Sequence, residues 1–278
     1  MQPFLIHAPK ADVSAVVFDS PHSGIVLPDH FRYACARQDL MHLHDPHVEK
    51  LLEDVPSTGA PVLEALIHRT CIDLNRYDDE IDPAMISGDW PHPVRQTFYT
   101  AKKLGLFPAF AGPRANRISA IYNDKARLNV AEAEHRITTY HRPYYAALNI
   151  LLQDARKAHG HAVHVDVHSF QRQGDMADII LGDGGDENPL CAPRLKHIIQ
   201  KHFEDAGFHV DFNGTYFSGG ALIHATSALK TGQHSIQIEI ARDLYMNTET
   251  LAFAPAKGSK IKHTMTRLAK TLSDSPLL

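Results

Sequence analysis

The chain has 278 residues, enough to bury a substantial hydrophobic core. Its apolar fraction of 44% and charged fraction of 22% are ordinary for a globular protein, and a formal net charge of −4 offers no cationic field for nucleic acid. No apolar stretch approaches the roughly 18 residues that span a bilayer, so we expect neither a nucleic acid nor a membrane as partner.

Three cysteines, Cys35, Cys71 and Cys191, are odd in number and widely spaced. This spacing argues against a disulfide framework and favours a reducing compartment. The N-terminus shows neither the basic nor the apolar segment of an export signal. We therefore expect a cytoplasmic protein with buried, inert cysteines.

In chain order, β-branched and apolar runs predict strands at 14–19, 61–67, 70–74, 162–167, 177–181, 207–212 and 235–240. Apolar residues at three- and four-residue spacing predict helices at 47–55, 123–159, 190–206 and 255–272. Pro143 predicts a kink in the second helix, and residues 77–117 read as a long irregular excursion of the kind that is often functional. The alternation predicts an α/β fold, a single domain over residues 1–278 with one mixed, mostly parallel sheet and helices on both faces.

Two histidine segments each follow a strand-like run: Pro21-His22-Ser23-Gly24 and Asp166-Val167-His168-Ser169. Residues just past strand ends are where ligands gather in α/β proteins. Asp166 shares a strand face with His168, and Gly24 would let the backbone approach a ligand closely. Two imidazoles with nearby carboxylates suggest a metal site; the alternative is a pair of histidines that pack at turns.

The segment His42-Leu43-His44-Asp45-Pro46-His47 offers further ligand candidates. Catalytic zinc sites commonly use three protein ligands, often two imidazoles and a carboxylate. Asp45, held extended before Pro46, is a plausible carboxylate ligand. His47 is the rival, or a substrate contact at a helix N-terminus, and a solvated histidine-rich loop remains the alternative.

The segment Asp73-Leu74-Asn75-Arg76 indicates a clamp for a substrate carboxylate. Arginine offers a planar fork for bidentate binding of a carboxylate, and asparagine adds neutral donors beside it. The alternative is an internal Asp73–Arg76 salt bridge at a strand end. A metal site together with such a clamp points to a metal-dependent hydrolase that acts on a small acidic molecule.

Glu239 lies within the apolar run Ile236-Gln237-Ile238-Glu239-Ile240. A carboxylate inside such a strand is costly to desolvate and needs a partner or a function. Alternation places Gln237 and Glu239 on one face, which either meets solvent or lines a site where Glu239 is the general base. Gly219-Gly220 would present backbone N–H groups to substrate, or form a tight turn.

Taken together, these segments resemble the N-formylglutamate amidohydrolase family, whose phosphorylase/hydrolase-like fold is similar to that of zinc carboxypeptidases and aspartoacylases. The resemblance runs from about residue 16 to 247. The matching segments are Pro21-His22-Ser23-Gly24, 45–51, 72–76, Arg142-Pro143-Tyr144, 166–169, Gly219-Gly220, 237–240 and Tyr245-Met246.

The resemblance implies one zinc ion held by His22, Asp45 and His168, with Glu239 as general base. It also implies that Asn75 and Arg76 grip the α-carboxylate of the substrate. The expected activity is hydrolysis of the amide of an N-formyl amino acid such as N-formylglutamate, which releases formate and the free amino acid.

A further arginine, Arg172 or Arg142, is expected to stabilise the tetrahedral oxyanion. We assign Arg172 to catalysis and Arg142, with Gly219 and Gly220, to substrate binding.

Other activities stay open. Family members tend to carry an arginine shortly after the Gly-Gly pair, where this chain has Ile223-His224-Ala225. One alternative is therefore a carboxypeptidase- or aspartoacylase-like zinc amidase for longer N-acyl amino acids or small peptides. Another is a zinc-stabilised binding protein without catalysis. The chain is expected to act as a monomer or a homodimer.

Overall fold

The computed structural model describes residues 2–112, 119–124, 126–214 and 217–275, which divide into two compact units. One, here called the loop unit, consists of Met1–Leu5, Pro21–His44 and Ala65–Ala146. The other, here called the sheet unit, consists of Ile6–Ser20, Asp45–Glu64 and Ala147–Leu278. The single domain over residues 1–278 stays a prediction.

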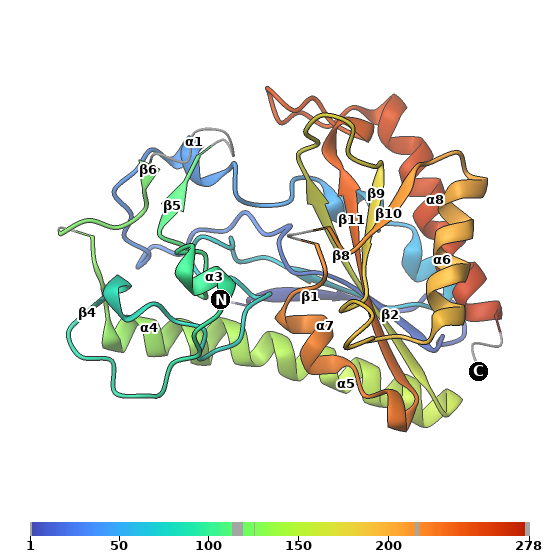
Figure 1. Cartoon of the computed structure of the whole chain (residues 1–278), viewed down its shortest axis with the longest axis horizontal. Coiled ribbons are helices and arrows are strands. Elements are labelled where there is room, and N and C mark those ends of the chain that lie inside the picture. Colours follow the sequence, from blue (N-terminus) through green and yellow to red (C-terminus); the bar gives the residue numbers. More distant parts are fainter. Residues whose placement is uncertain (1, 113–118, 125, 215–216, 276–278) are drawn as a thin grey trace. The chain divides into compact units, whose positions relative to one another are not determined.

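The helices and strands of the described residues are shown in Figure 1. The strands are β1 (Phe4–His7), β2 (Val16–Ser20), β3 (Val62–Ala65), β4 (Ile86–Ser87), β5 (Phe110–Ala111), β6 (Ser119–Ala120), β7 (Leu128–Asn129), β8 (Ala162–Phe170), β9 (Ile179–Gly182), β10 (Val210–Phe212) and β11 (Gln233–Ala241). The α-helices are α1 (Arg37–Leu40), α2 (Val48–Leu51), α3 (Phe98–Ala101), α4 (Val130–Arg136), α5 (Arg142–His159), α6 (Pro193–Asp205), α7 (Ala221–Thr226) and α8 (Pro255–Asp274). No helix of the described residues is long and apolar enough to cross a membrane.

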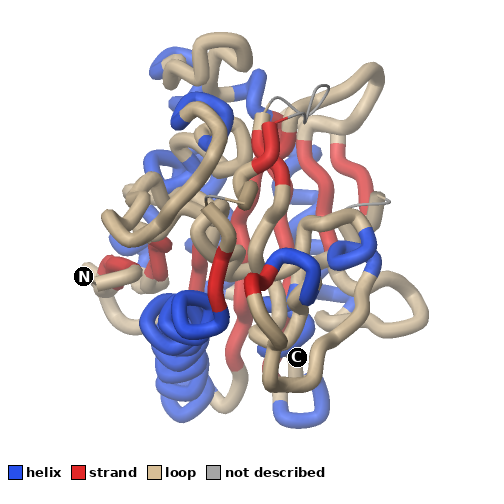
Figure 2. Tube along the Cα trace, turned by 90° about the vertical axis from the view of Figure 1, so that its left-hand side faces the viewer, coloured by secondary structure: helices blue, strands red, loops and turns tan. Residues whose placement is uncertain are grey.

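Seven strands form one sheet in the order β1-β3-β2-β8-β11-β9-β10. Strands β3, β2, β8 and β11 pair in parallel, as do β9 and β10, whereas β9 runs antiparallel to β11. The strands lie side by side in Figure 2. The predicted α/β class, with a mixed and mostly parallel sheet, is confirmed.

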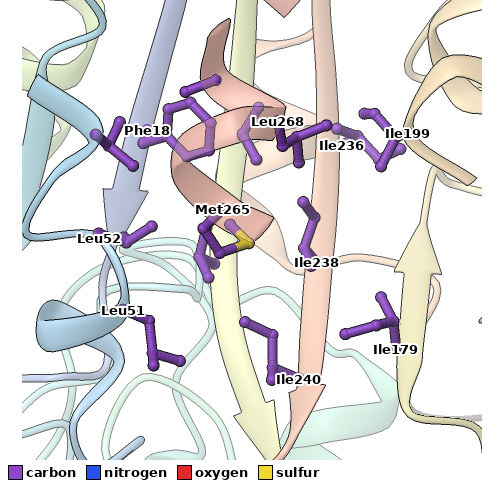
Figure 3. Close-up of a cluster of buried hydrophobic side chains, with 14 of the residues drawn as sticks. Phe18, Leu51, Leu52, Ile179, Ile199, Ile236, Ile238, Ile240, Met265 and Leu268 are labelled. Carbon is purple, nitrogen blue, oxygen red and sulfur yellow. The ribbon is translucent and has the colours of Figure 1, made fainter. Parts of the chain in front are cut away.

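One face of this sheet carries the main hydrophobic core of the sheet unit. β-Branched and aromatic residues alternate along the central strands, so Phe18 of β2, Val165 of β8 and Ile238 of β11 point to the same side and are fully buried. Helices α2, α6 and α8 cover that side, and α8 contributes Met265 and Leu268 (Figure 3). Pro255 opens α8 at a position where its missing N–H costs no hydrogen bond.

The opposite face of the central strands is polar but equally buried, and α7 packs against it. His164 of β8 lies between Asp19 of β2, 2.8 Å from Nε2, and Thr226 of α7, 2.8 Å from Nδ1. The Thr226 hydroxyl is in turn 2.9 Å from that of Ser235 on β11. Buried polar groups require such partners, so this face is built for hydrogen bonding, and the prediction of helices on both faces is confirmed.

The loop unit contains only short elements within its described residues, among them the pairs β4–β7 and β5–β6. The predicted excursion at 77–117 is confirmed as largely irregular, although residues 113–117 lie outside the described residues. Gly24 is required for a close approach of backbone to backbone: a Cβ there would lie 2.3 Å from the carbonyl oxygen of Ile67.

The strand predicted at 70–74 is wrong. This segment is a buried turn, in which the Cys71 N–H donates to the carbonyl of His68 and the Asp73 carboxylate accepts from the N–H of Asn75. A side chain that bonds its own backbone competes with a strand ladder, and apolar residues that are buried within a turn imitate the pattern of a strand.

The helix predicted at 123–159 begins later and is interrupted. Asn129 caps α4 by accepting from the N–H of Glu132, so the helix starts at Val130. A π-helical turn, Ile137–His141, separates α4 from α5 just before Pro143. A proline ring clashes with the carbonyl four residues earlier, and the wider turn relieves that clash where the kink was predicted.

The cysteines are free, with Cys71 and Cys191 buried. Burial raises the pKa of the Cys71 thiol to about 11 and that of Cys191 to about 12. Both side chains are therefore protonated and unreactive at neutral pH.

Candidate active site

The register of β8 and β11 places Glu239, the predicted general base, beside His168, a predicted metal ligand. His168 pairs with Glu239 and Asp166 pairs with Gln237, at the carboxyl ends of two parallel strands. Paired residues of neighbouring strands share a face and lie about 5 Å apart. All four side chains are buried on the polar face of the sheet, so an imidazole and a carboxylate are held side by side.

His168 is surrounded by carboxylates. Its Nδ1 donates to Asp45 Oδ2 at 2.9 Å, and its Nε2 lies 2.9 Å from Asp166 Oδ1. Burial alone would lower the pKa of His168, but Asp166, Asp45 and Glu239 outweigh it and hold that pKa well above its usual range. A cationic group is therefore favoured at this position, whether it is a proton on the ring or a metal ion bound to it.

Asp45, rather than His47, is the member of the 42–47 segment that contacts His168. The backbone turns sharply after Pro46, where His47 has a positive φ of 66°. His47 then donates from Nε2 to the carbonyl of Leu251 at 2.9 Å. The two candidates for third ligand are thus held in different surroundings.

Arg242 is a functional candidate that the sequence analysis passed over. It follows β11 directly, and its Nη2 donates to Asp45 Oδ1 at 3.0 Å. Its Nε donates to the hydroxyl of Ser169 at 3.1 Å. An arginine directly after a central strand was the available signal, because ligand-contacting groups gather at that end of a parallel sheet.

Gly219 and Gly220 shape a turn and orient the Glu239 carboxylate. The Gly220 N–H donates to Gln237 Oε1 at 3.0 Å, and Gln237 Nε2 donates to Glu239 Oε1 at 3.0 Å. Gly219 has a φ of +127°, and a Cβ there would lie 2.4 Å from Ile223. The N–H group of Gly220 is therefore bound within the protein instead of facing a ligand.

In the loop unit, His22 is paired with Asp73. His22 Nε2 donates to Asp73 Oδ1 at 2.7 Å, and Arg69 donates to the other carboxylate oxygen. Burial would raise the pKa of Asp73, but the charges of Arg69, His22 and Arg76 outweigh it and hold that pKa well below its usual range. Asp73 is thus a stable carboxylate that orients the His22 ring.

Arg76 is held in a fixed orientation by its side chain. Its Nε donates to the carbonyl of Leu104 at 3.0 Å, and its Nη1 donates to the carbonyl of Asn75 at 2.7 Å. The guanidinium carbon lies 3.6 Å from the centre of the Tyr99 ring, and Nε is 3.9 Å from the Glu80 carboxylate. Nη2 makes no hydrogen bond to any described residue, which suits it to bind an anion from outside the protein.

The main chain at Arg76 is held as well. Its carbonyl accepts from His141 Nε2 at 2.7 Å and from the Tyr145 hydroxyl at 3.1 Å. Both donors come from the π-helical turn and the start of α5, and their rings stack on each other. The helix interruption therefore positions the segment that contains Asn75 and Arg76.

Arg142 is oriented differently from its neighbour His141. Its side chain is 62% exposed and forms an ion pair with Asp78 at 3.1 Å. The structure gives it a surface partner rather than a place beside Arg76.

Arg172 has acceptors for all three of its nitrogens. Nε donates to Asp243 at 3.1 Å, Nη1 to the carbonyl of Met176 at 3.1 Å, and Nη2 to Asp178 at 2.6 Å. This guanidinium is used to fasten the chain after β8.

Of the three predicted metal ligands, His22 belongs to the loop unit, whereas Asp45 and His168 belong to the sheet unit, and the set stays a prediction. Two imidazoles and a carboxylate match the ligands of catalytic zinc. Carboxylates also flank the histidines, as Asp73 does for His22, and this is the usual environment of histidine ligands.

An α/β sheet that holds a buried glutamate beside a histidine at its strand ends places a proton acceptor next to an imidazole, an arrangement used by enzymes of the acid–base class. The particular family follows from comparison with known proteins. The model of the N-formylglutamate amidohydrolase family matches residues 14–246, and the chain belongs to that family. The match runs through segments of both units.

Individual relatives agree. The chain is 26% identical to an N-formylglutamate deformylase of Pseudomonas putida, over 83% of this chain and 81% of the relative, and 23% identical to one of Pseudomonas aeruginosa, over 74% and 71%. Among solved structures, an N-formylglutamate amidohydrolase from Ralstonia eutropha JMP134 has a TM-score of 0.90 and 31% identity, covering 99% of this chain and 98% of that one.

Proposed function

We propose that this protein is a zinc-dependent amidohydrolase that removes the formyl group from an N-formyl amino acid such as N-formylglutamate. The family supports the reaction class, since its relatives are deformylases of this substrate. The observation that carries the proposal is the pairing of Glu239 with His168 across β8 and β11. It provides a general base beside a histidine in a buried site.

His22, Asp45 and His168 are proposed to hold the metal ion. The donor set fits zinc, and because Asp73 binds Nε2 of His22, this histidine would use its Nδ1 nitrogen as the ligand atom. When bound, zinc polarises an amide carbonyl and lowers the pKa of a water molecule towards about 7.

Glu239 is proposed to act as the general base. Its carboxylate takes a proton from the attacking water and returns it to the nitrogen of the leaving amino acid, so that the C–N bond breaks and formate is released. Gln237 holds this carboxylate in place through a hydrogen bond of 3.0 Å. Proton transfer by a positioned side chain contributes typically 10²- to 10⁴-fold to rate.

Asn75 and Arg76 are proposed to bind the α-carboxylate of the substrate. Hydrogen bonds to the Leu104 and Asn75 carbonyls and the contact with the Tyr99 ring fix the Arg76 side chain. Its Nη2 donates no hydrogen bond to any described residue. An oriented guanidinium binds a carboxylate at small entropic cost. Arg142 and Arg172 are engaged with other partners and have no part in the proposed mechanism.

The test combines metal analysis with a substrate panel. The purified protein should contain about one zinc per chain and should release amine from N-formylglutamate faster than from N-acetylglutamate or small peptides. A chelator should abolish the activity, and added zinc should restore it. Zinc-free protein at full activity would overturn the metal assignment, and faster cleavage of longer acyl groups or peptides would favour the amidase alternative.

Bound zinc without hydrolysis of any N-acyl amino acid would favour the binding-protein alternative. A small-molecule substrate follows from the family. The cytoplasmic location and the oligomeric state stay predictions.

A further inference from the structure

We infer that Arg242 is a positioning residue that holds the Asp45 carboxylate towards His168 and so sets the affinity of the site for its metal ion. The inference rests on the proposed metal-dependent function. It assigns a role to a residue that has no part in the mechanism proposed above.

The contacts show a shared carboxylate. Asp45 gives one oxygen to His168 Nδ1 at 2.9 Å and the other to Arg242 Nη2 at 3.0 Å. Asp45 is 3% exposed and Arg242 is 8% exposed. With both oxygens bound in a buried place, the carboxylate is held in one orientation, and each of these two contacts contributes to holding it.

The second contact of Arg242 fixes the guanidinium itself. Nε donates to the hydroxyl of Ser169, which directly follows His168 on β8. Arg242 directly follows Ala241, the last residue of β11, and lies three residues after Glu239. One guanidinium therefore joins the ends of two neighbouring strands to the segment that carries Asp45.

The geometry of the fork matters in addition to the charge. Asp45, Asp166 and Glu239 place three carboxylates around His168, and arginine is a cation at every accessible pH. A lysine would keep that charge but could not reach Asp45 and Ser169 in one plane. Charge and geometry can thus be separated by two substitutions at the same position.

The experiment compares Arg242→Lys and Arg242→Met with the wild-type protein. Zinc affinity is measured by competition with a chromophoric chelator, and kcat and KM are measured on the reconstituted enzymes. Outer contacts to metal ligands are typically worth 10- to 100-fold in metal affinity or activity. We expect both variants to bind zinc about 10- to 100-fold more weakly, with a lower kcat and an almost unchanged KM.

A purely electrostatic role gives a different pattern. Arg242→Lys would then bind zinc like the wild type, and Arg242→Met would bind it more tightly, because a positive charge near the cation has been removed. Either result would overturn the inference. Lys196→Met is the matched control, since it breaks the 2.7 Å ion pair with buried Asp183 in the same unit and should leave zinc affinity unchanged.

Folding is checked by circular dichroism and thermal melting. If both Arg242 variants fail to fold, Ser169→Ala provides the test, because it removes the hydroxyl that accepts from Nε and should weaken zinc binding about two- to fivefold through a looser guanidinium. Unchanged affinity in Ser169→Ala would then count against the inference. A wild-type protein that neither binds zinc nor hydrolyses the substrate would overturn the proposed function instead.

Discussion

The sheet unit and the loop unit each contain a histidine that contacts an aspartate, and in each the aspartate contacts an arginine. In the sheet unit His168 donates to Asp45, whose other oxygen accepts from Arg242. In the loop unit His22 donates to Asp73, whose other oxygen accepts from Arg69. The chemistry is alike: a carboxylate orients an imidazole and an arginine neutralises the carboxylate.

The two units differ in what holds each histidine in place. His168 is fixed by the hydrogen-bonded ladder of β8, which pairs it with Glu239 on β11. His22 and Asp73 lie in turns, where side chains bond to the backbone, as Asp73 does to the N–H of Asn75. A sheet thus positions a polar side chain through its register, whereas a loop needs a separate polar contact for each residue.

The largest effect is expected at Glu239, the proposed general base on β11. Glu239→Gln keeps the shape of the side chain and can still bond to Gln237, but it cannot accept a proton from water. We expect kcat to fall at least about 100-fold, while the zinc content and KM stay near those of the wild type. Steady-state kinetics together with metal analysis test this, and turnover close to wild type would show that another group is the base.

A smaller effect is expected at Arg76, which is proposed to bind the α-carboxylate of the substrate. Arg76→Lys keeps the charge but loses the fork, the bonds to the Leu104 and Asn75 carbonyls and the contact with Tyr99. A hydrogen bond to a charged group is worth about 1.5–3 kcal/mol, so we expect KM to rise roughly 10- to 100-fold with little change in kcat.

An analogue that carries an α-carboxamide in place of the α-carboxylate makes this test specific. For the wild type, KM for the analogue should exceed KM for the normal substrate by roughly 10- to 100-fold. For Arg76→Lys, the two KM values should be nearly equal, because the contact with the carboxylate is already lost. If the analogue raised KM by the same factor in the wild type and in Arg76→Lys, Arg76 would not contact the carboxylate. Arg95→Lys, at the surface pair with Asp79, serves as control.

The same contrast explains which features the sequence predicts. The central strands are recognisable because β-branched residues alternate along them, and β8 and β11 lie where the pattern places them. That alternation also placed Gln237 and Glu239 on one face, as the paired register of β8 and β11 shows. Local periodicity therefore predicts the parts of the site that are carried by strands.

Contacts between distant parts of the chain leave no such pattern. Asp45 and Arg242 are 197 residues apart, and nothing around either position indicates the other. The segment 70–74 was misread because buried Ile72 and Leu74 imitate a strand, although the polar bonds of Asp73 make it a turn. Sequence analysis assigned Arg172 to catalysis and Arg142 to substrate binding, because their partners Asp178 and Asp78 are apparent only in the fold.

The smallest effect is expected where a loop contact has a duplicate. Tyr145→Phe removes the hydroxyl that donates to the Arg76 carbonyl at 3.1 Å, but His141 still donates to the same oxygen at 2.7 Å. A neutral hydrogen bond contributes about 1 kcal/mol, so KM should rise at most about fivefold, with kcat unchanged.

Steady-state kinetics beside Tyr140→Phe, a hydroxyl removed from the adjacent helical turn, would isolate this contact. A loss in Tyr145→Phe as large as that in Arg76→Lys would mean that the main chain at Arg76 depends on a single bond. In that case His141 could not replace Tyr145 as a donor to the Arg76 carbonyl. The position of Arg76 would then depend on one hydrogen bond, whereas the position of Glu239 depends on the whole ladder between β8 and β11.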